Sequence, residues 1–126
     1  MIDAREEVKE ALQANAAVTA VCPAANIHIV RAGRDNKDFP RICIIENDNA
    51  PAVTADNQET ASAVRFDLWM WDHEMSSLAA LCNAVNQAMR AIGFRRGGAG
   101  PDGYVIGPDV FEKMLWFQGT FQNPNN

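Results

Sequence analysis

The chain contains 126 residues, 48% of them hydrophobic, and carries a formal net charge of −5. This length and composition predict one globular domain over residues 1–126 with a single core, and the acidic balance argues against a protein that grips nucleic-acid phosphates over a broad surface. Three widely separated cysteines without a CxxC spacing predict neither a disulfide framework nor a zinc site and suit a reducing cytoplasm: Cys22, Cys43 and Cys82.

The beginning of the chain carries acidic residues at the place where a secretory signal would be basic. The longest weakly polar stretch, residues 16–25, is much shorter than the roughly 20 residues that a membrane-spanning helix needs. We therefore expect a soluble protein with no membrane partner.

The first third of the chain predicts helix followed by strand. Asp3 with Glu6 three residues later forms a capping-box pattern and predicts a helix over residues 3–14. Residues 16–21 predict a further short turn of helix before Pro23. A short strand is expected over residues 27–30, and a charged loop over residues 31–39.

The middle of the chain predicts two longer strands. Residues 41–46 are apolar on both faces, which is typical of an inner strand. Residues 47–59 are rich in Asn and Asp and predict either a second long loop or a protruding hairpin. A strand over about residues 61–71 follows.

The stretch 63–72 alternates between two faces, and this is the most informative pattern in the chain. One face carries Val64, Phe66, Leu68 and Met70, and the other carries Arg65, Asp67, Trp69 and Trp71. Two tryptophans beside charged residues are not suited to contact with water alone. The pattern therefore favours contact with a partner or with an overlying element, and it indicates assembly rather than catalysis.

The last part of the chain predicts a helix and further strands. Apolar residues recur at helical spacing from Met75 to Ile92 and predict a helix that starts at Asp72 and ends near Gly93. Residues 95–103 predict a flexible loop, residues 104–106 a short strand, and residues 107–109 a turn. A final strand over residues 110–121 has an apolar face, and a polar tail follows from about residue 122. The residues of that face are Phe111, Leu115, Phe117 and Phe121.

This order predicts an α+β fold. We expect a single small domain with an antiparallel or mixed sheet of four to five strands and two main helices packed on one side.

The layout resembles the tail completion, or tail terminator, proteins that join head and tail in tailed bacteriophages and prophages. The similarity covers most of the chain and is carried by the order of the elements. Its local patterns are the opening amphipathic helix, the segments 26–30, 39–45 and 64–69, the helix over residues 77–92, and the closing strand. The resemblance implies a structural virion protein in the tail or neck, assembled in the bacterial host cytoplasm.

Members of that family form hexameric rings that stop growth of the tail tube. The resemblance thus implies a homo-oligomer, with the tail-tube protein and head connector proteins as partners. The acidic net charge suits a channel through which DNA passes without specific binding. Two alternatives stay open: another neck or head-tail connector component, and a small cytoplasmic ligand-binding or regulatory domain.

Two groups of residues are candidates for an oligomer or partner interface. Arg31, Arg34 and Lys37 lie in the first charged loop, but Asp35 and Asp38 nearly balance them, which favours a solvated loop. Trp69 and Trp71 suit an interface, where tryptophan is enriched. The alternative is that a helix of the same domain covers these two tryptophans.

No catalytic residue, cofactor-binding residue or metal ligand is predicted, and we expect that the protein is not an enzyme. Arg95 and Arg96 precede a glycine-rich segment but lack a P-loop pattern, so a surface loop is favoured over a phosphate site. His28 and His73 have no ligand partner at helical spacing. Asp72 and Glu74 are best explained as the cap and first-turn charge of the following helix.

Overall fold

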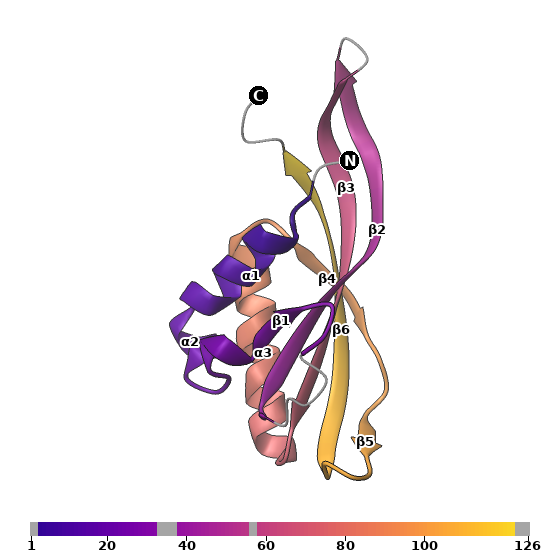
Figure 1. Cartoon of the computed structure of the whole chain (residues 1–126). Helices are drawn as coiled ribbons and strands as arrows, with labels where there is room; N and C mark the ends of the chain where they lie inside the picture. Colours follow the sequence, from indigo (N-terminus) through magenta and orange to yellow (C-terminus); the bar gives the residue numbers. More distant parts are fainter. Residues whose placement is uncertain (1–2, 33–37, 56–57, 123–126) are drawn as a thin grey trace.

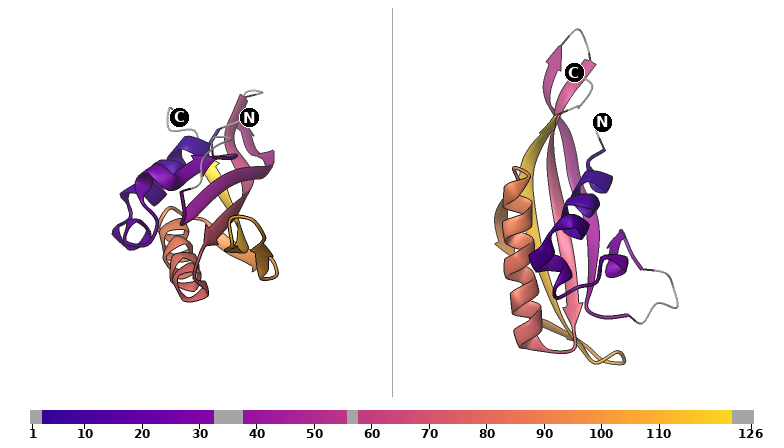
Figure 2. Two further views of the ribbon diagram at one scale, coloured as in Figure 1. Left: turned by 60° about the horizontal axis from the view of Figure 1, so that its bottom comes forward. Right: turned by 90° about the vertical axis from the view of Figure 1, so that its left-hand side faces the viewer.

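The computed structural model describes residues 3–32, 38–55 and 58–122, which form one sheet with its helices on one face (Figures 1 and 2). The helices are α1 (Arg5–Ala14), α2 (Ala16–Thr19) and α3 (Met75–Ala91), with a 3-10 turn η1 at Ala24–Asn26. The α+β class and the placement of two main helices on one side are confirmed. None of the helices in these ranges combines the length and apolarity that crossing a membrane requires.

Six strands form the sheet in the order β1-β2-β3-β6-β4, and β5 also pairs with β6. The pair β1–β2 is parallel and the other pairs are antiparallel, so the sheet is mixed. The strands are β1 (Ile27–Ile29), β2 (Arg41–Ala55), β3 (Gln58–Asp72), β4 (Arg95–Ala99), β5 (Gly103–Val105) and β6 (Val110–Gln122).

Strands β2 and β3 are 15 residues each and form a hairpin whose far end projects beyond the helices (Figure 1). Of the two alternatives for residues 47–59, the structure confirms the protruding hairpin for the residues it describes. Register shifts between Glu46 and Asp48 and again after Pro51 twist the ribbon as it leaves the body of the molecule.

The core lies between the helices and the face of the sheet that carries Phe66 and Leu68, as the alternation in the sequence predicts. Phe66 packs edge-on against Phe94, with ring centroids 5.6 Å apart. The register places Phe117 opposite Phe66 and Leu115 opposite Leu68, so the apolar faces of β3 and β6 coincide. The predicted apolar stripe of α3 is confirmed except near its two ends, where Met75 and Ile92 are 40% and 41% exposed.

Both predicted helix caps are displaced. The N-cap of α1 is Ala4, because the Asp3 carboxylate is held by Arg5, from which it accepts both the backbone N–H and the guanidinium Nε–H. The N-cap of α3 is Glu74. Asp72 still pairs with Phe111 in the sheet, so the helix starts later than predicted, and the Asp72 carboxylate accepts the N–H of Glu74 at 3.3 Å.

The prediction of a flexible loop over residues 95–103 is wrong, since residues 95–99 form β4 and Gly103 begins β5. This strand brings the sheet to six strands, one more than the sequence predicts. Glycine is generally unfavourable in a strand, but here an added Cβ at Gly97 or Gly98 would overlap the Trp116 ring. The segment is a strand because it pairs with β6, and the close approach of the Trp116 ring accounts for glycine at these two positions.

Candidate functional site: the open face of the sheet

The candidate site is the face of the sheet turned away from α1, α2 and α3, which we call the open face. Alternation along β3 places Arg65, Asp67, Trp69 and Trp71 on it, as predicted. The register adds side chains from the neighbouring strands, with Cys43 and Met114 on either side of Trp69.

Trp69 and Trp71 lie nearly parallel on this face, with ring centroids 6.4 Å apart and an interplanar angle of 19°. Trp71 is anchored because its indole Nε1–H donates to Glu112 Oε1 at 2.9 Å. Both side chains are half-buried, and the helices pack on the opposite face (Figure 2). None of the described helices α1, α2 and α3 therefore covers the two tryptophans, which contradicts the alternative for this part of the chain.

A second cluster on the open face is built around Arg65. Its guanidinium lies 4.3 Å from the centre of the Trp116 ring, and its Nε–H donates to Asp67 Oδ1 at 3.0 Å. Asp67 is buried and also accepts from the Asn47 amide Nδ2 at 2.6 Å. Because the buried carboxylate is paired on both oxygens, it holds Arg65 flat against the tryptophan.

Trp116 is therefore fixed on two sides, by Arg65 and by the glycines of β4. Sequence reasoning missed this residue, although the alternation of β6 contains the signal. The apolar face of that strand takes the odd positions, so Trp116 falls on the other face, beside Asp67 in the register.

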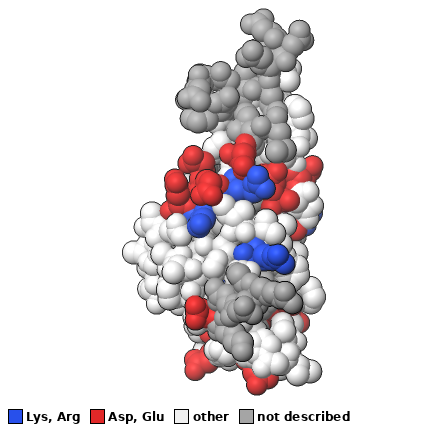
Figure 3. All heavy atoms as spheres, viewed as in Figure 1, with Lys and Arg blue, Asp and Glu red and all other residues white. Residues whose placement is uncertain are grey.

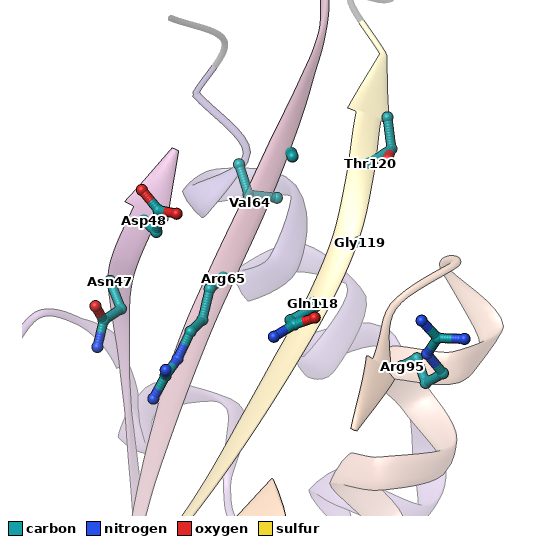
Figure 4. Close-up of a pocket in the computed structure, with 9 residues that line it drawn as sticks. Asn47, Asp48, Val64, Arg65, Arg95, Gln118, Gly119 and Thr120 are labelled. Atoms are coloured by element: carbon teal, nitrogen blue, oxygen red, sulfur yellow. The ribbon is translucent and has the colours of Figure 1, made fainter. Parts of the chain in front are cut away.

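An open groove of about 700 Å³ lies along the upper part of the open face (Figure 4). Arg65 and Arg95 approach it from β3 and β4, and Gln118 lies between them on β6. Asp48 lines the opposite side, so the groove contains both signs of charge. Its lining is completed by Asn47, Ala63, Val64, Gly119 and Thr120.

The charged-loop residues are not brought into this site by the described structure. Arg31 is exposed at the end of β1, where its backbone N–H donates to the carbonyl of Ile29 at 2.9 Å. Arg34 and Lys37 lie outside the described residues. An interface role for this loop stays a prediction.

Among the residues considered for metal binding, His73 has a backbone partner, whereas His28 Nε2 is buried without a hydrogen-bond partner among the described residues. The His73 Nδ1 lies 3.1 Å from the backbone carbonyl of Asp109, within hydrogen-bond distance. Burial lowers the pKa of His28 and raises the pKa of Cys22 to about 12 and of Cys82 to about 11, which leaves these thiols protonated and weakly nucleophilic. Within the described ranges, no three metal-ligating side chains gather.

Comparison with known proteins adds an independent line of evidence. A family model described as "Tail completion protein gp17" matches residues 6–98, which is about three quarters of the chain. A chain of a solved structure titled "Virion of native gene transfer agent (GTA) particle" superposes with a TM-score of 0.65 at 15% identity, covering 92% of each chain, and so shares the fold. No curated protein matches. The chain belongs to the tail completion protein gp17 family, and it is a structural protein of a phage tail.

Proposed function

We propose that this protein forms a homo-oligomeric ring that ends the tail tube and joins it to the head connector. The observation that carries the proposal is the open face, where Trp69 and Trp71 stack without any helix of the described chain above them. Large aromatic side chains that stay partly exposed on a sheet are typical of surfaces buried in assembly. The proposed role is structural and needs no chemical step.

The edges of the sheet also suit contacts between subunits. Strand β1 pairs with β2 at residues 42–44, and no other described strand pairs with that edge of β2. An unpaired edge presents backbone N–H and C=O groups that a neighbouring chain can use. In a ring, the projecting hairpin of one copy would lie against the next.

Six copies are expected from the family, and DNA would pass through the centre without specific binding. The net charge of −5 per chain supports this, because a lumen of like charge keeps the duplex from adhering. The gene transfer agent structure that shares this fold is titled as a virion, which supports a place in the particle for this chain.

The test is the mass in solution by light scattering after size exclusion, over a wide range of protein concentration and with tail tubes added. We expect a species near 83 kDa, about six times the 13.8 kDa chain. Tubes assembled with the protein should have one uniform length in electron micrographs and should join purified heads.

A matched pair of variants locates the surface. Trp69→Glu places a charge on the open face, and Ala79→Glu places the same charge on an exposed position of α3. We expect Trp69→Glu to abolish the ring and Ala79→Glu to leave it intact. The reverse result would assign the contact to the helix layer. A protein that stays monomeric even with tail tubes present and binds only the head connector would be another neck component.

A further inference from the structure

The two edges of the sheet carry opposite charges at the ends of one row of side chains. On the open face, this row of paired residues crosses the sheet from β2 to β4. In order, it consists of Asp48, Arg65, Gln118 and Arg95 (Figure 4). The row therefore ends in an exposed carboxylate at the β2 edge and in an exposed guanidinium at the β4 edge.

The adjacent row, on the face that packs against the helices, ends in the same two signs. In order, it consists of Glu46, Phe66, Phe117 and Arg96. Glu46 is half-buried and Arg96 is exposed. In Figure 3, acidic side chains gather over α1 and over the neighbouring stretch of β2, whereas β4 begins with two arginines. At these two rows, the β2 edge is thus acidic and the β4 edge basic on both faces of the sheet.

The charges at the ends of the open-face row are not neutralised within their own chain. No ion pair between described residues includes Asp48 or Arg95. Arg65, the neighbour of Asp48 in the row, is already paired with Asp67. Three strand spacings of about 4.8 Å separate the backbones of β2 and β4, so Asp48 and Arg95 are about 14 Å apart and do not reach each other.

Both edges also offer backbone groups for pairing. Strand β4 is the last strand of the sheet, and no described strand pairs with its outer side. On β2, the carbonyl of Ile44 accepts the N–H of Val30 at 2.8 Å, which shows that the backbone groups of Ile44 face the outer edge. Because alternate residues of a strand face the same edge, Glu46 is the next residue to do so. Free edges of this kind are templates for another chain.

We propose that the β2 edge of one copy of this protein pairs with the β4 edge of the next copy, so that the sheet continues from subunit to subunit. Three antiparallel pairs link β2 to β4, so these strands run in opposite directions and the new pair is antiparallel. The two edges are different parts of one chain, and the contact is therefore head-to-tail. The inference rests on the self-assembly proposed above and names the strands that meet.

A single register satisfies both charge pairs. The register shift after Glu46 places Glu46 and Asp48 in adjacent rows, and Arg96 and Arg95 occupy the same two rows on β4. When the rows continue across the contact, Glu46 lies beside Arg96 of the next copy and Asp48 beside its Arg95. Opposite charges that lie side by side on paired strands stabilise the pairing, whereas like charges oppose it.

Charge reversal at the two ends of the open-face row tests the contact. Asp48→Arg and Arg95→Glu each place like charges side by side, and each should weaken association at least about tenfold in light scattering over a range of concentration. Arg90→Glu is the control, because it changes the net charge as Arg95→Glu does but lies in the last turn of α3. We expect Arg90→Glu to associate like wild type.

The double variant with Asp48→Arg and Arg95→Glu in one chain is the decisive protein. It should associate within about threefold of wild type, because the reversed charges attract again across the contact, although they are too far apart to interact within one chain. This recovery would also show that the single variants fail to associate for a reason other than misfolding. A double variant that associates no better than the single ones overturns the proposal.

Disulfide cross-linking tests the same contact without charge. Protein with Asp48→Cys is mixed with protein with Arg95→Cys under mild oxidation, and the control mixture replaces the second protein with Arg90→Cys. Cβ atoms of directly opposed residues on paired strands are about 4.5–5.5 Å apart, so we expect a linked pair at least about tenfold faster than in the control. Equal rates overturn the proposal. Burial raises the pKa of all three native thiols, which keeps the background low.

The outcomes separate this contact from the proposed ring. If the charge reversals and the cross-linking behave like their controls while Trp69→Glu abolishes the ring, the ring stands and the edge contact is refuted. If the double variant recovers and the cross-link forms, but no closed species appears with or without tail tubes, the edge contact stands and the ring is refuted.

Discussion

Replacing Gly97 with alanine tests how Trp116 is held on the open face. An added Cβ would lie inside the Trp116 ring, and a Cβ at the adjacent Gly98 would also come within 2.5 Å of the indole Nε1. The ring cannot retreat freely, because Arg65 stacks on it at 4.3 Å. Gly97→Ala must therefore displace the ring or distort β4.

The expected loss of stability is about 1.5–4 kcal/mol. Overpacking of this kind costs about 1–3 kcal/mol, and losing the contact between Arg65 and Trp116 adds about 0.5–1 kcal/mol. With a urea m-value of about 2 kcal/mol/M, the midpoint of unfolding should fall by about 1–2 M. Urea titration followed by tryptophan fluorescence measures this, and the native spectrum should also shift because Trp116 moves.

Gly100→Ala is the matched control. Its added Cβ would meet Met114 at 3.7 Å, an ordinary contact, so the free energy of unfolding should change by less than about 1 kcal/mol. Combining Gly97→Ala with Trp116→Leu should cost less than the sum of the two single changes, since the smaller side chain makes room. If Gly97→Ala unfolds at the same urea concentration as wild type, the account of the β4–Trp116 contact is refuted.

Three further outcomes follow from the structure. Val30 is 52% exposed and has a φ of 70°, a left-handed backbone conformation that strains a β-branched residue by about 1 kcal/mol. Val30→Asn should therefore raise the midpoint of thermal unfolding, and an unchanged or lower midpoint contradicts this. Trp71→Phe removes the hydrogen bond to Glu112 and should destabilise by about 1 kcal/mol in urea titration, whereas a neutral result means that solvent replaces the bond. The three thiols should react slowly with thiol reagents at pH 8 and quickly after denaturation, and a fast-reacting native thiol would contradict the raised pKa values of Cys22, Cys43 and Cys82. The free energy of unfolding should also fall as the pH rises above about 9, because the unfolded chain then loses thiol protons that the folded chain keeps.

Much of the fold follows from local patterns in the sequence. The alternation over residues 63–72 assigned residues 64–71 of β3 to the correct faces, and the helical spacing from Met75 onward located α3. Both patterns arise because buried side chains must recur with the period of the backbone. The order of these elements was also enough to indicate the family that the comparison with known proteins shows.

The errors came where distant residues determine the local structure. Residues 95–99 have the composition of a loop, but they form β4 by pairing with β6, where the Trp116 ring packs against the two glycines. Asp72 is of a residue type that is favoured at helix N-caps, but pairing with Phe111 keeps its backbone in the sheet. In both cases a contact between segments far apart in the chain outweighed local propensity.

The sequence by itself determined the class of fold, the two faces of β3 and the place of two tryptophans on one of these faces, since each of these depends on periodicity alone. Only the tertiary structure decided that no described helix covers Trp69 and Trp71 and that Arg65 and Trp116 meet. These features depend on which strands become neighbours and on which side of the sheet the helices pack. Such choices are made by contacts across the whole chain, which no local pattern specifies.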